Sequence, residues 1–291
     1  MDDSKQLMPQ QQDYSDILII DGDAIPYMIG WFQKEHTDIN RTNEVVDSFM
    51  NDFLVITGAS KFIGILAFNG WPNGISTSKC FRYDLYQYKP YKGNRSGEKD
   101  EWIKFWEPHI RQRLIERWGF SCAAAWLETD DVVAYLSVVT KGIICSPDKD
   151  LKQMPGAFYN YKEIGTEKHK GVEIVTPKEA LRNFYFQLLV GDSTDNINGV
   201  TGMGEVKANK LLNETSEMLW GVEVRLAYQK QYGSYYGPII YLETEDVIQM
   251  MTPTHRLWEQ YARVYGFNIQ DYIKQIKNSR DYARSFRREV E

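Results

Sequence analysis

The stretch "DILIIDGDAI" (residues 16–25) sets an unbroken apolar run directly before two aspartates. An apolar run without alternation is typical of a strand that is buried on both faces, as in a parallel sheet. Asp21 follows the run at the strand's carboxyl end, where sheets of this kind bind their ligands. We therefore predict a buried strand over 16–20 with an acidic residue at its functional edge.

Other segments continue this alternation of buried strands and helices. Strands are predicted at 61–68, near 120–126, at 142–146 and at 172–175, and helices at 43–57, from 130, over 177–190 and through most of the chain beyond 200. This order indicates an α/β fold, with a mostly parallel central sheet flanked by helices. We expect a disordered tail at 1–13, a core over 14–175 and a C-terminal helical region over 176–291.

The composition excludes several kinds of site. The 291-residue chain has a net charge of −6, three cysteines and four histidines, none of them in a metal-binding or disulfide pattern. Zinc chemistry and histidine-based nucleophilic catalysis are therefore disfavoured, and oxygen ligands must supply any metal chemistry. No stretch is long and apolar enough for a membrane span and no signal-peptide core is present, so we expect a cytoplasmic protein without a membrane partner.

One segment is basic within this acidic chain. Residues 79–118 hold ten lysines and arginines against six acids: Lys79, Arg82, Lys89, Lys92, Arg95, Lys99, Lys104, Arg111, Arg113 and Arg117. The net negative charge of the whole chain therefore does not exclude an anionic partner.

Acidic side chains follow three of the predicted strands. The first strand leads to Asp21, the third to Glu128, Asp130 and Asp131, and the fourth to Asp148 and Asp150, while Asn69 follows the second. Carboxyl ends of parallel strands meet at one edge of a sheet, so these acids would repel one another strongly unless cations neutralised them. Hard carboxylate oxygens favour magnesium or manganese, and the pattern therefore predicts a divalent metal site.

Two of these acids also have a purely structural interpretation. In "WLETDDVVAYL" (126–136), Thr129 is a good N-cap, and Asp130 and Asp131 would then be ordinary acids in the first turn of a helix. In the same way, "SPDKDL" favours a helix start with Ser146 as N-cap and Pro147 at its first position.

A further acidic pair lies in "GDSTDN". Asp192 and Asp195 are three positions apart, and on a helix they would share a face. A haloacid-dehalogenase-like phosphatase would use Asp21 as nucleophile and Asp23 as acid/base, with "GDSTD" as its late motif. That motif should follow a strand, whereas the preceding periodicity here is helical. We therefore favour Asp23 as a helix-start acid before Ala24.

The segment "NINGVTGMGEVKANKLL" (196–212) predicts a glycine hairpin that runs into a helix. Backbone amides exposed at a helix N-terminus bind phosphate, and the early lysines Lys207 and Lys210 would favour the same anion. The alternative is a plain helix–turn–helix connector with solvated lysines. A P-loop is excluded because no Gly-Lys-Ser/Thr follows.

Taken in order, these motifs resemble those of the 5′-nuclease superfamily, which includes flap endonucleases, the 5′-nuclease domain of DNA polymerase I and phage 5′-3′ exonucleases. "LIIDGDAI", "YKPYKGNR" (88–95), "LETDDVVAYL", "ICSPDKDLKQM" and "GDSTDNINGVTGMGEVKANKLL" correspond to its motifs in family order over about 17–212. The resemblance implies a PIN-like core, a helical arch at about 88–118 that includes Trp102, Phe105 and Trp106, and a helix–hairpin–helix motif at about 190–213.

The resemblance also implies roles for individual residues. Asp21, Glu128 and Asp130 would hold one magnesium ion with support from Asp131, and Asp148, Asp150, Asp192 and Asp195 would hold or orient a second. Lys92 and Arg95 would contact the scissile phosphate, and Tyr91 would stack on a terminal base. The DNA-binding hairpin would comprise Gly199, Val200, Gly202, Gly204, Lys207 and Lys210. Asn69 departs from the aspartate that many members have after the second strand.

The implied activity is 5′-3′ exonuclease and flap endonuclease action on duplex DNA with a 5′ end, nick or flap. The expected cofactors are two Mg²⁺ ions, with Mn²⁺ as a substitute and K⁺ at the hairpin. RNA–DNA hybrids would be a second substrate, and the expected setting is phage DNA replication by a monomer. Two alternatives are a PIN-like ribonuclease and a non-catalytic DNA-binding accessory protein.

Overall fold

The computed structural model describes residues 14–68, 80–95, 98–266, 268 and 270–274. The predicted tail at 1–13 and Asn69 lie outside the described residues.

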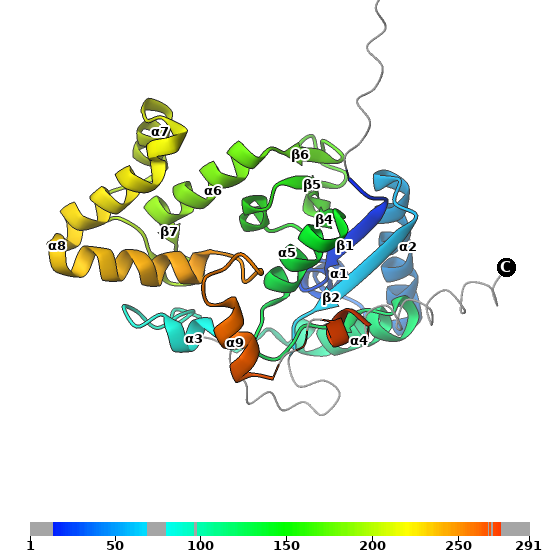
Figure 1. The fold of residues 1–291 in the computed structure, drawn as a ribbon. Coiled ribbons are helices and arrows are strands. Elements are labelled where there is room, and N and C mark those ends of the chain that lie inside the picture. The colour runs from blue at the N-terminus through cyan, green and yellow to red at the C-terminus, as the bar shows by residue number, and fades with distance from the viewer. Residues whose placement is uncertain (1–13, 69–79, 96–97, 267, 269, 275–291) are drawn as a thin grey trace, which may run out of the picture.

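A six-stranded sheet forms the centre of the fold (Figure 1). Its strands are β1 (Ile17–Asp21), β2 (Lys61–Leu66), β3 (Ser121–Cys122), β4 (Ile143–Cys145), β5 (Gly156–Tyr159) and β6 (Glu173–Val175). They lie in the order β3-β2-β1-β4-β5-β6, and all pairs are parallel except the antiparallel pair of β5 and β6. The predicted α/β fold with a mostly parallel sheet is confirmed.

The strands at the middle of the sheet end nearly level with one another. In the register, Asp21 of β1 faces Ile65 of β2, and Ile20 faces Cys145 at the end of β4. The chain segments that leave β1 and β4 therefore begin at the same edge, which is where the acids of both segments lie.

Helices follow the strands and also form a separate region beyond the sheet. They are α1 (Ile25–Phe32), α2 (Ile39–Thr57), α3 (Arg82–Leu85), α4 (Glu101–Trp118), α5 (Thr129–Thr140), α6 (Pro177–Val190), α7 (Glu205–Glu214), α8 (Trp220–Ile248) and α9 (Trp258–Val264), with short 3₁₀ turns η1 (Lys149–Gln153), η2 (Tyr161–Glu163) and η3 (Glu217–Leu219). A small hairpin of β7 (Gly191–Asp192) and β8 (Ile197–Asn198) follows α6.

The two faces of the sheet bury alternate residues of β1, as the pleat requires. Leu18 and Ile20 belong to a core with Trp106 of α4, whereas Ile19 belongs to a core on the other face with Val132 of α5. A third core joins α6, α7 and α8, and Figure 1 shows these helices beside the sheet rather than over it. Among the described residues, no helix is long and apolar enough to cross a membrane.

The predicted start of a helix at Ser146 is wrong. Ser146 is fully buried, and its hydroxyl donates to Asp21 at 2.7 Å. The turn that follows is η1, and its N-cap is Asp148, whose carboxylate accepts from the amide of Asp150 at 2.8 Å. Ser146 thus donates to the acid on β1 and accepts from the amide of Asp148 at 3.0 Å, but the N-cap of the turn is Asp148.

The predicted arch does not extend to residue 118. Residues 101–118 form α4, which packs on α1 and on the sheet through Trp106, Ile110 and Leu114. The indole of Trp106 is 1% exposed and donates to the carbonyl of Gln33 at 3.1 Å. A helix with this much buried apolar surface belongs to the core and cannot stand free as an arch.

Candidate metal and nucleic-acid site

The predicted acids gather where β1, β4 and α5 meet. Two adjoining clefts, of about 920 Å³ and about 510 Å³, open there. Asp21 lines the first cleft, while Asp150, Asp192 and Asp195 line the second. The wall between the clefts is shared and includes Lys92, Arg95, Glu128, Asp130 and Asp148. The fold therefore brings together acids from four separate segments of the chain.

In one group of these acids, burial and mutual repulsion outweigh any nearby positive charge, which for Asp150 comes from Lys149. Burial, followed by repulsion from Asp23, raises the pKa of Asp21 to about 7. Burial and the carboxylates of Asp21 and Asp148 raise the pKa of Asp130 well above its ordinary value. Burial and then Asp148 likewise raise the pKa of Asp150 to about 7. Mutual repulsion of this kind is what a bound cation relieves.

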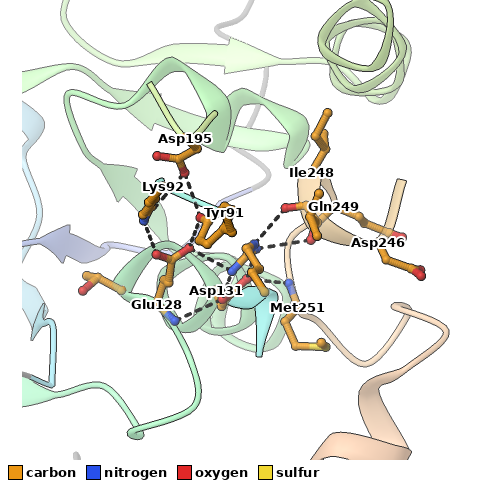
Figure 2. Close-up of polar contacts among 12 residues, drawn as sticks. Tyr91, Lys92, Glu128, Asp131, Asp195, Asp246, Ile248, Gln249 and Met251 are labelled. Carbon is orange, nitrogen blue, oxygen red and sulfur yellow. Dashed lines mark hydrogen bonds and ion pairs between the residues drawn. The ribbon is translucent and has the colours of Figure 1, made fainter. Parts of the chain in front are cut away.

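A second group of acids is already paired with cations. Lys92 forms an ion pair with Glu128 and lies 3.6 Å from a carboxylate oxygen of Asp195. Arg95 donates to Asp195 at 2.5 Å. Burial opposes the charge of Lys92, but Glu128 and Asp195 outweigh it and raise the pKa of Lys92. Figure 2 shows Lys92 between the two carboxylates.

Tyr91 has a different position from the one predicted. Its side chain is 3% exposed, and its hydroxyl lies 2.7 Å from Glu128 and 2.8 Å from Asp195. The ring packs edge-on against Tyr83. A ring buried in this way offers no face to a base, so the stacking prediction is contradicted, and Tyr91 instead holds two of the acids together.

Asp131 is a structural acid rather than a metal ligand. One of its oxygens accepts from Arg82 at 2.8 Å and from the amide of Met251 at 2.7 Å. The other accepts from Arg82 at 2.7 Å and from the amide of Glu128 at 3.1 Å. Because Asp131 is 0% exposed and both oxygens are used, it has no oxygen left for a metal.

The start of α5 also differs from the predicted one. Glu128, not Thr129, is the N-cap, and it forms a capping box with Asp131. Thr129 is the first helical residue, and its hydroxyl donates to Asp23 at 2.6 Å. Asp23 accepts in addition from the amide of Ala67 at 2.7 Å, so it ties the ends of β1 and β2 to α5.

Asp192 and Asp195 do not share a helical face. Helix α6 ends at Gly191, whose φ of +77° a side chain would strain, and the two acids lie in and after β7. Asp192 accepts from the amide of Thr194 at 2.7 Å, whereas Asp195 faces Lys92 and Arg95. The turn still brings both acids to the second cleft.

The acids suit a hard divalent cation in their chemistry. Among the described residues, no three histidine, cysteine or acidic side chains converge closely enough on one point to enclose an ion. Asp21, Asp130, Asp148 and Asp150 nevertheless present buried oxygen donors whose pKa values are raised, and oxygen donors are the ligands of magnesium and manganese. The residues therefore fit a divalent ion.

The glycine hairpin has an inner and an outer part. Gly199 and Val200 are buried, and the Val200 amide donates to Leu189, so these two residues shape the turn, although both also line a third cleft of about 430 Å³. Gly202, at φ +74°, and Gly204, the N-cap of α7, are exposed. Lys207 and Lys210 are exposed on α7, and Lys207 donates to the carbonyl of Gly202 at 2.9 Å.

Sequence reasoning missed two residues that support the acids. Tyr161 is fully buried, and its hydroxyl donates to the carbonyl of Asp21 at 2.7 Å. Arg82 was counted only as part of the basic segment, yet it is 3% exposed and ion-paired to Glu128 and Asp131. Its position between apolar neighbours in "CFRYDLY" was the one available signal that this arginine is buried.

The fold and site define a class: an α/β protein whose parallel sheet gathers acids and cations at one edge, beside a glycine hairpin. No family model matches the chain. It is 31% identical to DNA polymerase I of Caldicellulosiruptor bescii over 153 residues, which cover 45% of this chain and 17% of that protein. It is 28% identical to the 5′-3′ exonuclease of Bacillus subtilis over 216 residues, which cover 68% of this chain and 70% of that protein.

A solved structure of a flap endonuclease has a similar fold. The crystal structure of a bacteriophage T5 D15 flap endonuclease variant, in a pseudo-enzyme-product complex with DNA and metal ions, aligns at a TM-score of 0.61 over 92% of this chain and 99% of that chain, with 14% identity. The chain is thus similar in sequence to a 5′-3′ exonuclease and similar in fold to a flap endonuclease. The chain spans only 17% of the length of the polymerase that it matches.

Proposed function

We propose that this protein is a metal-dependent 5′-nuclease that hydrolyses phosphodiesters of duplex DNA at 5′ ends and flaps. The observation that supports this proposal most strongly is that buried acids with raised pKa values and the cations Lys92 and Arg95 line the same two clefts. Nuclease chemistry needs both: anionic ligands for metals, and cations for the phosphate. The names of the exonuclease and flap endonuclease relatives support the proposal.

Two divalent ions would supply the central chemistry, since they lower the pKa of a water nucleophile and stabilise the leaving oxygen. Asp21, Glu128 and Asp130 would hold one ion. Asp148, Asp150, Asp192 and Asp195 would hold or orient the other. Asp131 drops out of this set because its oxygens are used by Arg82 and by backbone amides.

The cations of segment 88–95 orient the substrate in this proposal. Lys92 is 15% exposed at its side chain and lines both clefts, so its ammonium can contact a phosphate in either one. Arg95 is more exposed, at 53%, and can meet a phosphate at the rim. Tyr91 keeps Glu128 and Asp195 at a fixed separation while the cations turn towards the substrate.

The outer part of the hairpin would hold the duplex away from the clefts. The exposed amides at Gly202 and Gly204 and the side chains of Lys207 and Lys210 suit a phosphate backbone. Potassium at this hairpin is part of the proposal. It would compete with the Lys207 ammonium for the Gly202 carbonyl.

A cleavage assay tests the function. A 5′-labelled DNA flap and a blunt duplex are incubated with the protein in magnesium, in manganese and in EDTA, beside the Asp148→Asn and Asp150→Asn variants. We expect cleavage near the junction or from the 5′ end that needs the metal and is lost in both variants. Full activity in the variants would refute the assignment.

The same assay separates the alternatives. Preference for structured RNA over the DNA flap would favour a PIN-like ribonuclease. Tight flap binding without cleavage in either metal would favour an accessory protein. Action on RNA–DNA hybrids, a monomeric state, a cytoplasmic location and a role in phage DNA replication stay predictions from the resemblance.

A further inference from the structure

Arg82 is a buried cation that the proposed function does not use. Every N–H direction of its guanidinium has a partner: Nε donates to the Val247 carbonyl at 2.8 Å, and Nη2 to the Gln249 carbonyl at 3.4 Å. Nη1 donates to Glu128 at 3.1 Å, and the fork as a whole grips Asp131. A desolvated arginine with this many fixed partners holds a geometry rather than a mobile ligand.

The contacts divide the two oxygens of Glu128 between different partners. One oxygen accepts from Arg82 and from Tyr91, while the other pairs with Lys92. The first oxygen is therefore fixed by groups that are 3% exposed, and the second faces a cation at the wall of the clefts. Arg82 and Tyr91 thus occupy one oxygen of Glu128 and leave the other to Lys92.

Arg82 also contacts the backbone of Glu128 indirectly, through Asp131. The amide of Glu128 donates to the Asp131 oxygen that Arg82 grips from the other side. In Figure 2, Asp131 lies between Glu128 and Met251, and it accepts from the backbone amides of both residues. The guanidinium thus joins Glu128 to the C-terminal region.

We propose that Arg82 is a positioning residue that fixes one oxygen of Glu128 against the end of α8 and thereby presents the other oxygen to a divalent cation. The inference rests on the proposed function for the identity of the cation. Its test reads metal binding directly, so that it does not depend on cleavage. Loss of such supporting contacts typically weakens metal affinity by ~10–100-fold.

The test is Arg82→Lys, titrated with Mn²⁺ by the electron paramagnetic resonance signal of the free ion. Lysine keeps the charge beside Asp131 but presents its donors from one atom, so it cannot serve Glu128, Asp131 and Val247 together. We expect ~10-fold or greater loss of Mn²⁺ affinity, with flap binding in calcium unchanged within about twofold. Arg256→Lys is the matched control, because Arg256 pairs with Asp246 in the same C-terminal part and is half exposed.

Asp131→Asn keeps the inference testable if Arg82→Lys does not fold. An asparagine amide would face either the Arg82 and Glu128 donors or the Arg82 and Met251 donors, and it would shift the guanidinium in both cases. Weaker Mn²⁺ binding by this variant supports the positioning role. Mn²⁺ affinity within twofold in the folded variant, or an equal loss in Arg256→Lys, overturns it.

These outcomes differ from a failure of the proposed function. If the Arg82→Lys variant cleaves DNA and binds Mn²⁺ as well as the unaltered protein does, only the positioning role is overturned. If Arg82→Lys weakens Mn²⁺ binding but the unaltered protein cleaves neither DNA nor RNA, the positioning role is supported and the proposed nuclease function is refuted. A protein that binds no Mn²⁺ would overturn both.

Discussion

Lys92 forms an ion pair with Glu128 inside the wall that two acidic clefts share. Arg82 and Lys92 counteract the effect of burial and lower the pKa of Glu128, so this acid is ionised and neutralised by the protein itself. A divalent cation that uses Glu128 must therefore compete with the ammonium of Lys92. The same ammonium is then available for a phosphate.

The first prediction concerns this competition. Lys92→Met should raise the Mn²⁺ affinity of the free protein by roughly tenfold, since removing a partly buried ion-pair partner worth about 1.4 kcal/mol changes an equilibrium tenfold. It should also lower the cleavage rate by about 10²-fold, because the phosphate loses a cation. Calorimetric titration with Mn²⁺ and single-turnover cleavage measure the two effects.

Lys89→Met is the control for this experiment. Lys89 lies in the same segment, but its ammonium donates to Asn198 at 2.9 Å rather than to an acid. Its loss should leave Mn²⁺ affinity unchanged. Weaker Mn²⁺ binding in Lys92→Met would mean that Lys92 organises the acids rather than competing with the ion.

Elements with a strong local pattern were predicted correctly from sequence. The apolar run at β1 and the helix α6, with its Thr176 capping box, need no distant partner to be recognised. Local patterns also predicted that acids follow β1 and β4. The sheet then brings these acids to one edge, because parallel strands end on the same side.

The incorrect predictions at individual residues have a common physical cause. The positions of these side chains depend on contacts between segments that are distant in the sequence. Arg82 meets Asp131 from 49 positions away, and Tyr91 meets Asp195 from 104 positions away. Periodicity cannot show that Asp131 is occupied, that Tyr91 is enclosed, or that a helix breaks at Gly191. A conformation such as φ +77° at Gly191 is read only from the folded backbone.

The second prediction is a pH dependence of stability in EDTA. The pKa of Asp150 rises from 3.8 to about 7 on folding, through burial and repulsion from Asp148. The folded state therefore holds a proton that the unfolded state releases between about pH 4 and 7. The contribution of this proton to the stability of the folded state is fully present below about pH 4. The free energy of unfolding should therefore fall by a few kcal/mol as the pH rises to about 7.

The Asp150→Asn variant and added magnesium each test whether Asp150 causes this pH dependence. The variant should flatten the fall and should be the more stable protein in EDTA at pH 8, by about 1–3 kcal/mol. Magnesium should restore stability to the unaltered protein at pH 8, because it binds the ionised acids, and should not restore it at pH 5. Urea unfolding at each pH measures this, and equal pH profiles for both proteins would contradict the assignment.

A third prediction concerns the packing of the sheet. A Cβ at Gly64 of β2 would lie 2.4 Å from the ring of Phe120, which is 3% exposed. Gly64→Ala should therefore destabilise the fold by about 1–3 kcal/mol through overpacking. Adding Phe120→Leu should recover part of this loss, because a smaller side chain leaves room for the methyl group. Additive losses in the double variant would place the strain elsewhere.

The last prediction separates DNA contact from folding at the glycine hairpin. A Cβ at Gly204 meets no atom within 4 Å, and its φ of −76° suits any residue, so Gly204→Ala should leave the melting temperature nearly unchanged. If a phosphate backbone lies against this turn, the methyl group would push it away and weaken duplex binding by about tenfold, or 1.4 kcal/mol.

Gly202→Ala is the contrasting variant. Its φ of +74° should destabilise the fold by about 1 kcal/mol whether or not DNA binds there. Fluorescence anisotropy with a labelled flap in calcium measures both affinities. Unchanged affinity in Gly204→Ala would move the duplex away from this turn, because the fold itself places no demand on that position.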